Sequence, residues 1–259
     1  MSKQSILVTG GAGYIGSHTV RRLCAEGYRV IVLDNLVYGH VESIVDDEVN
    51  LFVGDVSDKE LLRNLFKVYE FVGVIHFAAF AYVFSSTCAT YGEPDKLPIT
   101  EDQPQRPMSP YGRSKLMLEW ILKDCDTAWG LKSTALRYFN ASGCSTDGKI
   151  GETHDPETHL IPLVLQAIKG DIPELTVYGT DYPTPDGTCI RDYIHVEDLA
   201  SAHFLALQYL IEGGESIQCN LGTGVGVSIR EIIDAAEYVT GHKVPVKYGE
   251  RRPGDPAHL

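Results

Sequence analysis

The sequence has no excess of basic residues and no long apolar run, and each absence excludes a class of protein. Lys and Arg number 22 against 35 Asp and Glu, which gives a formal net charge of −13. A surface this acidic repels phosphate backbones, so we expect no nucleic-acid partner. No apolar run approaches the ~18 residues that a membrane-spanning helix requires, so we expect no membrane association.

Paired cysteines are also lacking. The six cysteines are scattered, with no Cys-x-x-Cys pair and no Cys/His metal spacing, so we expect free thiols in a reducing compartment and no bound metal. The first strand is expected to begin by Ser5, which leaves no room before it for a signal peptide. These features predict a soluble, cytoplasmic protein.

The first half of the chain contains short apolar runs that alternate with amphipathic stretches. The runs are rich in Val, Ile and Leu and are bounded by polar turns, which is typical of parallel strands buried on both faces. We therefore predict an α/β fold of the Rossmann type, with a doubly wound parallel sheet. Strands are expected at 6–9, 29–33, 49–53, 72–77, 83–86 and 133–137, and helices at 14–26, 59–69 and 110–127.

The strands expected at 72–77 and 83–86 are unusually close in the sequence. A parallel crossover takes a dozen or more residues, yet only Phe80 to Tyr82 separate the two apolar runs. Either the two runs form one element, or the chain lacks a crossover near residues 80–84. We favour the second interpretation.

A glycine-rich loop, TGGAGYIG at residues 9–16, follows the first strand and leads into a helix. Gly10 permits a tight turn, Gly13 lets the backbone approach a pyrophosphate, and Gly16 lets the helix pack closely on the strand. The phosphates of a dinucleotide would lie at the helix N-terminus, where free N–H groups favour an anion. We predict an NAD-binding Rossmann domain over residues 1–140.

Asp34 ends the second strand, where a carboxylate accepts hydrogen bonds from the adenosine ribose. A carboxylate there repels the extra phosphate of NADP, so NAD is favoured. Asp55 follows the third strand and lies either near the adenine or in a simple turn.

A candidate catalytic pair stands at the start of the helix expected at 110–127. Ser109 is suited to cap this helix and Pro110 to occupy its first position. Tyr111 and Lys115 are four residues apart, so their side chains project from one face. An ammonium beside the phenol, with a positive nicotinamide ring, stabilises the phenolate and makes Tyr111 a base for a sugar hydroxyl.

The strand that precedes this helix ends in hydroxyl side chains. Thr87 is placed to hydrogen-bond the reacting hydroxyl and share its proton with Tyr111, whereas Ser85 and Ser86 are interpreted as structural.

After about Asn140 the chain becomes rich in Gly, Pro, Thr and Asp. Short helices are expected at 160–169, 196–210 and 229–240, and strands at 218–221 and 244–248. Loop-rich segments beyond a parallel sheet usually form the substrate pocket. We predict a smaller, mainly substrate-binding α/β region over residues 141–259.

The motifs together resemble one family. The glycine loop, the Tyr111/Lys115 pair and Ser86-Thr87 resemble the extended short-chain dehydrogenase/reductase superfamily. The stretches RYFN at 137–140, GTCIRDYIHV at 187–196 and RRPGD at 251–255 narrow the resemblance to UDP-glucose (UDP-galactose) 4-epimerases. This implies an NAD-dependent isomerase with a UDP-sugar substrate, and a nucleotide-sugar site in region 141–259.

The resemblance also implies roles for individual residues. Thr87 matches the hydroxyl residue, Tyr111 the base and Lys115 its partner, whereas His159 replaces an asparagine of the family, which leaves its contact open. The implied cofactor-binding residues are Gly10, Gly13, Tyr14, Ile15, Gly16, Asp34, Asn35, Asp55, Val56, Phe77, Ala78, Ala79, Tyr111, Lys115 and Tyr138. The implied substrate-binding residues are Thr87, Asn140, His159, Leu160, Tyr178, Arg191, Arg252, Asp255 and Leu259.

Two departures from the family concern length. Family members carry roughly 30 to 40 more residues near positions 80–84, where they form the crossover that parallel strands need. The chain also stops at Leu259, so region 141–259 is expected to be truncated. A homodimer is expected from the family, and it becomes doubtful if the crossover helix is absent.

The residues after Thr87 narrow the choice of reaction. A 4,6-dehydratase of this fold needs an acid and a base there, and Cys88-Ala89 supply neither at neutral pH. We therefore expect redox-neutral 4-epimerisation of UDP-glucose and UDP-galactose through a 4-keto intermediate.

Two alternatives to this substrate pair and function stay open. UDP-N-acetylhexosamine or UDP-xylose/arabinose is the alternative substrate, because the resemblance places the small Leu259 beside the sugar. A catalytically silent NAD-binding sensor or scaffold is the alternative of another class, and the intact Tyr111, Lys115 and Thr87 argue against it.

Overall fold

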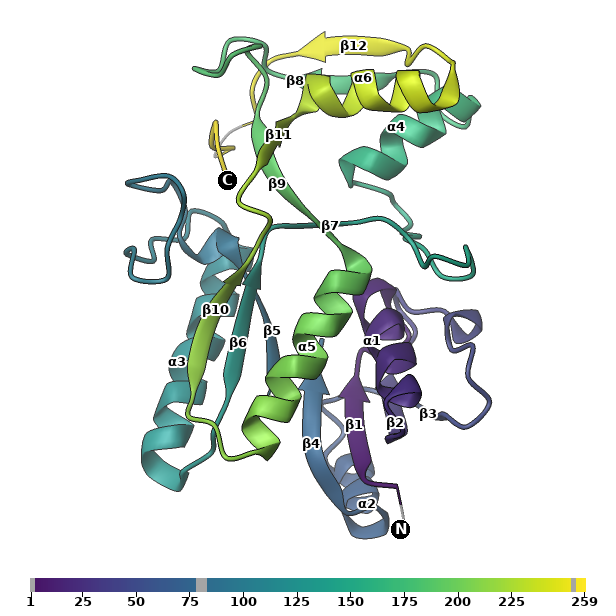
Figure 1. The fold of residues 1–259 in the computed structure, drawn as a ribbon, viewed down its shortest axis with the longest axis vertical. Helices are drawn as coiled ribbons and strands as arrows, with labels where there is room; N and C mark the ends of the chain where they lie inside the picture. The colour runs from purple at the N-terminus through teal and green to yellow at the C-terminus, as the bar shows by residue number, and fades with distance from the viewer. Residues whose placement is uncertain (1–2, 78–82, 253–254) are drawn as a thin grey trace.

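The structure is a computed structural model that describes residues 3–77, 83–252 and 255–259. Its main feature is a seven-stranded parallel sheet in the order β10-β6-β5-β4-β1-β2-β3 (Figure 1). This order is that of a Rossmann sheet and confirms the predicted fold class. The strands are β1 (Ser5–Thr9), β2 (Arg29–Asp34), β3 (Asn50–Val53), β4 (Phe71–His76), β5 (Val83–Thr87), β6 (Thr134–Tyr138) and β10 (Ile217–Leu221).

Helices cover both faces of this sheet. On one face, Ile6 and Val8 of β1 pack with residues of α1 (Tyr14–Ala25) and α5 (Val196–Ile211). The intervening Leu7 points to the other face and packs with Leu65 of α2 (Lys59–Val68). Farther along that face, α3 (Pro110–Trp129) contributes Leu122, which packs with Phe84 and Ala135. The continuous apolar runs are therefore explained by burial on both faces.

The two closely spaced runs are separate strands that lie side by side. β4 and β5 pair in parallel, with Ile75 opposite Val83 and His76 opposite Phe84. The interpretation that they form one element is therefore wrong. The first residues of β5 pair with the last residues of β4. A connection between these two strands therefore does not need to run back along the whole length of β4. Residues 78–82, where the missing crossover is expected, lie outside the described residues.

A smaller group of elements lies beyond the carboxyl ends of the sheet strands (Figure 1). A second core joins α4 (Leu160–Lys169), α6 (Ile229–Thr240), β8 (Leu175–Tyr178) and β12 (Val246–Gly249). A three-stranded sheet is formed by β7 (Asn140–Ser142), β9 (Ile190–His195) and β11 (Gly226–Ser228). The sequence analysis did not predict β7, β8, β9 or β11. The remaining elements are the short 3-10 helices η1 (Val41–Ser43) and η2 (Cys88–Thr90).

The chain passes through both parts of the molecule. After β9 it returns to the main sheet as α5 and β10, which pairs with β6. Part of the sequence after residue 140 thus completes the Rossmann sheet, while the assignment of 141–259 as mainly substrate-binding stays a prediction. Among the described residues, every helix is too short or too polar to cross a membrane.

Candidate active site

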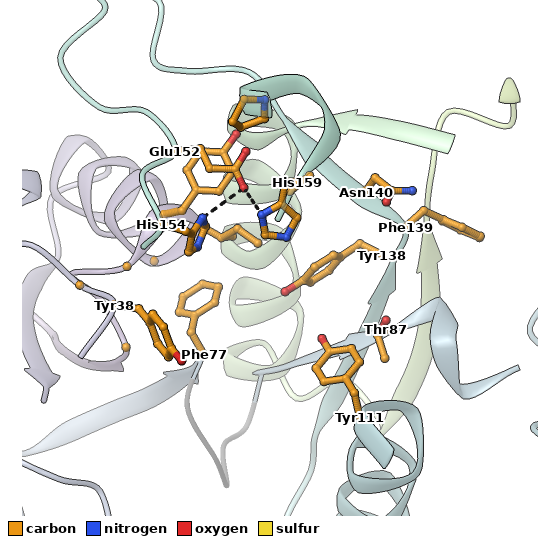
Figure 2. A pocket seen from close by; sticks show the side chains of 18 of the residues that line it. Tyr38, Phe77, Thr87, Tyr111, Tyr138, Phe139, Asn140, Glu152, His154 and His159 are labelled. Carbon is orange, nitrogen blue, oxygen red and sulfur yellow. Dashed lines mark ion pairs between the residues drawn. The ribbon is translucent and has the colours of Figure 1, made fainter. Parts of the chain in front are cut away.

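A cavity of about 620 Å³ opens at the carboxyl ends of the sheet strands, between the sheet and the smaller group of elements (Figure 2). This is where parallel α/β sheets bind ligands. The predicted site residues that line it are Gly10, Gly13, Tyr14, Ile15, Gly16, Asp34, Asn35, Val56, Phe77, Thr87, Tyr111, Tyr138, Asn140, His159, Leu160 and Leu259. Ala78 and Ala79 lie outside the described residues.

The glycine loop forms one wall of the cavity and has the geometry that the motif predicts. Gly10 has φ +72°, a left-handed conformation that favours glycine. A Cβ on Gly16 would lie 2.1 Å from the carbonyl oxygen of Gly10, so only glycine lets α1 begin this close to the loop. Gly13 is the N-cap of α1. Because it has no side chain, no side-chain cap covers the free N–H groups in the first turn of α1.

Asp34 fixes the glycine loop and faces the cavity. One carboxylate oxygen accepts a hydrogen bond from the backbone N–H of Ala12 at 2.9 Å, and the other accepts one from Leu36 at 2.9 Å. Each oxygen keeps a second lone pair that can accept from a ribose hydroxyl. The buried carboxylate thus fits the role predicted for NAD.

Asp55 lies outside the cavity lining and has the role of a turn residue. Its side chain accepts from the backbone N–H of Ser57 at 2.8 Å and from Asn35 at 3.3 Å. Of the two roles left open by the sequence, the turn role is the one that these contacts support. Asn35 and Val56 are the neighbours that reach the cavity.

Tyr111 and Thr87 meet at the sheet end of the cavity (Figure 2). Ser109 caps α3 by accepting from the N–H of Gly112 at 3.0 Å, and Pro110 begins the helix. A Cβ on Gly112 would lie 2.4 Å from the carbonyl oxygen of Ala89, so glycine lets α3 approach the end of β5. This close approach brings Tyr111 to Thr87, and it is a role of Gly112 that the sequence analysis missed.

The surroundings of Tyr111 act on its pKa in opposite directions. Burial raises the pKa of Tyr111, and the hydrogen bond with Thr87 opposes this only in part. Lys115 donates to the carbonyl oxygen of Ser85 at 2.8 Å, and its Nζ lies 5.7 Å from the centre of the Tyr111 ring. Burial lowers the pKa of Lys115 to about 8. The side chains alone therefore favour a protonated Tyr111, and a phenolate stabilised by Lys115 and the nicotinamide charge stays a prediction.

A buried ion pair behind the catalytic strand was not identified from the sequence. Arg137 of β6 donates to both carboxylate oxygens of Glu119 in α3, at 3.0 and 2.6 Å. Ser86 donates to the same carboxylate, and Arg137 donates to the hydroxyl of Tyr91 at 2.7 Å. This network joins α3 to β5 and β6 directly behind Thr87 and supports the structural interpretation of Ser86. The motif RYFN does not reveal this ion pair, because Glu119 lies 18 residues before Arg137 in the sequence.

The chemistry of two neighbouring side chains limits the reactions at this end of the cavity. Burial raises the pKa of the Cys88 thiol to about 12, so Cys88 carries its proton at neutral pH. Ala89 has no polar side-chain atom. The acid and base that a dehydratase needs here are absent, as the sequence analysis argued. Tyr138 also lines the cavity, and burial raises its pKa.

The predicted substrate-binding residues fall into two groups. Asn140, His159, Leu160 and Leu259 line the cavity together with Thr87. Arg191 forms an ion pair with Asp255, and Arg252 lies 4.0 Å above the ring of Tyr178. In the described part of the chain, these last four side chains are not part of the cavity lining.

Comparisons with known proteins agree on the family. The model of the NAD dependent epimerase/dehydratase family matches residues 80–222, and the model named GDP-mannose 4,6 dehydratase matches residues 7–87. A UDP-glucose 4-epimerase of Lacticaseibacillus casei is 46% identical, over 98% of this chain and 87% of the relative. The chain belongs to the UDP-glucose 4-epimerase family.

Solved structures of this family have the same fold. The UDP-glucose 4-epimerase of Brucella ovis, solved in complex with NAD, has a TM-score of 0.94 and 47% identity, covering 99% of this chain and 89% of that one. The UDP-Glc/GlcNAc 4-epimerase of Campylobacter jejuni has a TM-score of 0.82 and 38% identity, covering 99% and 89%.

The alignment with the L. casei epimerase extends over 289 positions, although the whole chain has 259 residues. The relative therefore carries residues inside the matched span that this chain lacks. A missing crossover near residues 80–84 stays a prediction.

Proposed function

We propose that the protein is an NAD-dependent epimerase that interconverts UDP-glucose and UDP-galactose at carbon 4, without net oxidation or reduction. The observation that carries this proposal is that one cavity has a dinucleotide-type glycine loop on one wall and the Tyr111–Thr87 pair at its end. The family supports it, because its relatives bear this name and one is solved with NAD.

NAD fits the residues of the glycine-loop wall. The free N–H groups at the start of α1 would hold the pyrophosphate, and Asp34 would accept from the adenosine ribose. When bound, NAD supplies a hydride acceptor and a positive nicotinamide charge. That charge acts on Tyr111 in the direction opposite to burial and lowers its pKa toward the range of a general base.

Tyr111 and Thr87 would move the proton in this reaction. The Tyr111 oxygen takes the proton of the sugar 4-hydroxyl, and Thr87 holds that hydroxyl in place. Lys115, fixed by the carbonyl of Ser85, keeps a positive charge near the phenol. The hydride of carbon 4 would pass to bound NAD and, after the 4-keto sugar turns over, return to the other face of that carbon, while Tyr111 would return the proton to the oxygen. Because the acid and base of a dehydratase are absent at Cys88-Ala89, the 4-keto sugar is not dehydrated.

The UDP part of the substrate would bind along the opposite side of the cavity. Asn140, His159 and Leu160 line that side. We assign Arg191, Arg252 and Asp255 to the diphosphate and uridine ribose, since the planar fork of arginine binds two phosphate oxygens at once. Because Arg191 is paired with Asp255, we expect its guanidinium to be held in place before the substrate binds.

The protein is further proposed to be cytoplasmic and to form a homodimer. The helix α3 supports the dimer, because Met117, Trp120 and Ile121 lie on one face and are 54%, 57% and 39% exposed. Such an apolar helix face is typical of an interface with another chain. Sedimentation of the purified protein at several concentrations tests this proposal, and a monomer at all of them would contradict it.

A second substrate class is favoured by the position of Leu259. This residue lines the cavity, and leucine leaves more room than tyrosine beside an N-acetyl group. The C. jejuni relative acts on both UDP-Glc and UDP-GlcNAc according to its name. UDP-xylose/arabinose remains a third alternative substrate, and an inert NAD sensor remains the alternative of another class.

A panel of UDP-sugars separates these possibilities. The protein is incubated with UDP-galactose, UDP-N-acetylgalactosamine or UDP-arabinose, and the products are separated by ion-exchange chromatography. We expect UDP-glucose from UDP-galactose at the highest kcat/KM, with no build-up of NADH absorbance. Faster turnover of an N-acetyl or pentose substrate would select that alternative. No turnover of any sugar by protein that binds NAD would favour the sensor.

A further inference from the structure

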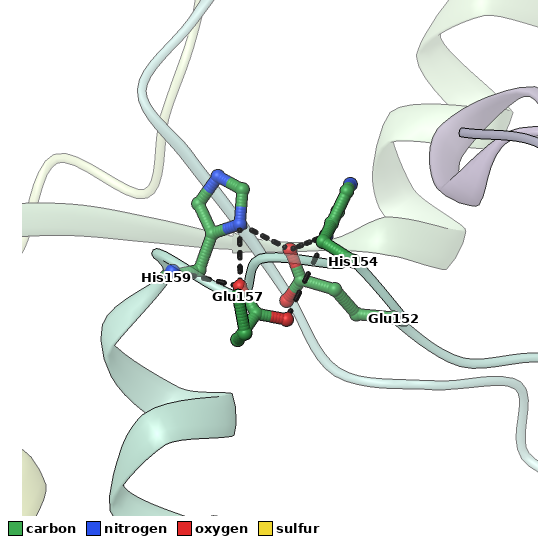
Figure 3. Close-up of side chains that lie close together, drawn as sticks. All are labelled: Glu152, His154, Glu157 and His159. Carbon is green, nitrogen blue, oxygen red and sulfur yellow. Dashed lines mark hydrogen bonds and ion pairs between the residues drawn. The ribbon is translucent and has the colours of Figure 1, made fainter. Parts of the chain in front are cut away.

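Two histidines and two glutamates lie close together (Figure 3), and three of them, Glu152, His154 and His159, line the cavity (Figure 2). Glu152, His154, Glu157 and His159 each offer one ligand atom, and all four atoms lie within 4.8 Å of one another. They come from the loop between β7 and α4, and His159 is the N-cap of α4. The reaction proposed above uses neither of the glutamates nor His154.

The spacing of these atoms matches a tetrahedral metal site. His159 Nδ1 lies 2.9 Å from Glu152 Oε1 and 3.2 Å from Glu157 Oε1. His154 Nδ1 lies 3.5 Å from Glu152 Oε1 and 3.7 Å from Glu157 Oε2. Around Zn²⁺, with bonds of about 2.0 to 2.1 Å, neighbouring ligand atoms are roughly 3.3 Å apart. The four observed distances lie on both sides of this value, with His159 facing one oxygen of Glu157 and His154 facing the other.

Hydrogen bonding alone does not account for His154. Its Nδ1 is buried, and the described part of the chain gives it no hydrogen-bond partner, although two carboxylates lie close by. A charged histidine that donates to a carboxylate would lie at about 2.7 to 2.9 Å. A nitrogen that points at two carboxylates from a longer distance has the position of a metal ligand.

The charge and rigidity of the cluster also suit a divalent cation. The side chains of Glu152 and Glu157 are only 10% and 5% exposed, so two negative charges are close together and poorly solvated. Glu157 is held by the backbone N–H groups of Thr158 and His159, at 2.7 and 2.8 Å. Two imidazoles and two carboxylates form a donor set that Zn²⁺ and similar transition metals accept.

We propose that Glu152, His154, Glu157 and His159 form a binding site for one divalent transition-metal ion, of which Zn²⁺ is the best match. No metal is expected from the sequence because it contains no Cys/His metal spacing, whereas these ligands are two histidines and two glutamates within eight residues. The site lies on the wall of the cavity, so the ion would add positive charge where nucleotide diphosphates are proposed to bind.

Metal binding by the purified full-length chain tests this proposal directly. The protein is freed of metal with a chelator and then titrated with Zn²⁺ alone by calorimetry. We expect one Zn²⁺ per chain, with affinity lowered at least about 100-fold by His154→Ala and also lowered by the shape-conserving Glu157→Gln. His242→Ala is the matched control, because His242 is exposed and distant in sequence from the cluster, and it should bind Zn²⁺ like the unchanged protein.

A second measurement distinguishes coordination from a general loss of structure. Co²⁺ alone is added in place of Zn²⁺, and the visible absorption reports whether the ion is tetrahedrally coordinated. The unchanged protein and His242→Ala should show the tetrahedral spectrum, and His154→Ala should lose it while its circular dichroism stays unchanged. Absence of stoichiometric Zn²⁺ binding, or equal binding by His154→Ala, would overturn the proposal and leave a histidine–carboxylate cluster only. Because no substrate is present, this outcome is independent of the proposed epimerase activity.

Discussion

Tyr111 is the residue on which the proposed chemistry depends most directly. Tyr111→Phe removes the hydroxyl and keeps the ring, so proton transfer is lost while packing is preserved. We expect kcat for UDP-galactose to fall by about 10²- to 10⁴-fold, with NAD affinity within a few-fold of the unchanged protein. Tyr248→Phe, on the exposed strand β12, is the control. Tyr111→Phe with full activity would show that another group is the base.

Lys115 makes the reaction sensitive to alkaline pH. Its pKa is lowered to about 8 by burial, so its positive charge is present below that pH and is lost above it. We expect kcat to decline above about pH 8, measured with UDP-galactose between pH 6 and 10. Lys115→Arg keeps its charge throughout this range, so the decline should move to higher pH even if the overall rate is lower. If kcat of Lys115→Arg declines at the same alkaline pH as that of the unchanged protein, a group other than Lys115 causes the decline.

At the scale of residues, a candidate site can be identified from the sequence where the pattern is local. Tyr111 and Lys115 are one helical turn apart, and the glycine loop is a continuous motif, so both could be identified without the fold. Glu119 and Arg137 could not, since only the sheet brings α3 and β6 together. The raised pKa of Tyr111 also depends on burial, which the sequence does not give.

The start of helix α1 is the element on which cofactor binding depends. In Gly16→Ala the new Cβ would meet the backbone carbonyl of Gly10 at 2.1 Å, so the loop must move. We expect NAD affinity, measured by calorimetry, to fall at least about tenfold, since a loop displaced by ~1 Å loses its binding geometry. Gly249→Ala is the control, because its Cβ would meet only ordinary contacts, 3.5 Å or farther away. Equal affinities would refute this role of Gly16.

The ion pair between α3 and β6 supports the catalytic end of the sheet. Both side chains are 5% exposed, so Glu119→Leu leaves Arg137 buried without its partner. We expect the free energy of unfolding to fall by about 3–5 kcal/mol, measured by urea denaturation. Glu119→Leu combined with Arg137→Met should recover much of this loss. Lys169→Met, in an exposed pair with Asp171, should change stability by less than about 1 kcal/mol; a similar small change for Glu119→Leu would contradict the account.

Elements with clear end signals were predicted closely. The helix expected at 229–240 agrees with α6, where Ser228 forms a capping box and Gly241 ends the helix in a left-handed conformation. The helix α4 likewise ends at Gly170, which has φ +85°. The strands β7 and β11 have three residues each, and such short segments show too few alternating residues to be recognised.

At the scale of the whole molecule, the doubly wound parallel sheet followed from the pattern of strands and helices, but the order of its strands and the path of the chain did not. The return of the chain to the main sheet as α5 and β10 depends on long-range packing of α5 against α1, which local patterns do not encode. The expectation of a missing crossover after β4 rests on a physical limit on parallel crossovers, and it stays a prediction. That the two runs are separate strands was settled by the pairing of β4 with β5.

The central claim is that one cavity removes a hydride from the sugar and returns it to the same carbon. UDP-galactose carrying deuterium at carbon 4 tests this most directly, with the UDP-glucose product examined by NMR after turnover in ordinary water. The account predicts that the deuterium is retained at carbon 4 of the product, with no net formation of reduced cofactor. Replacement of the deuterium by solvent hydrogen, or its accumulation in released NADH, would contradict it.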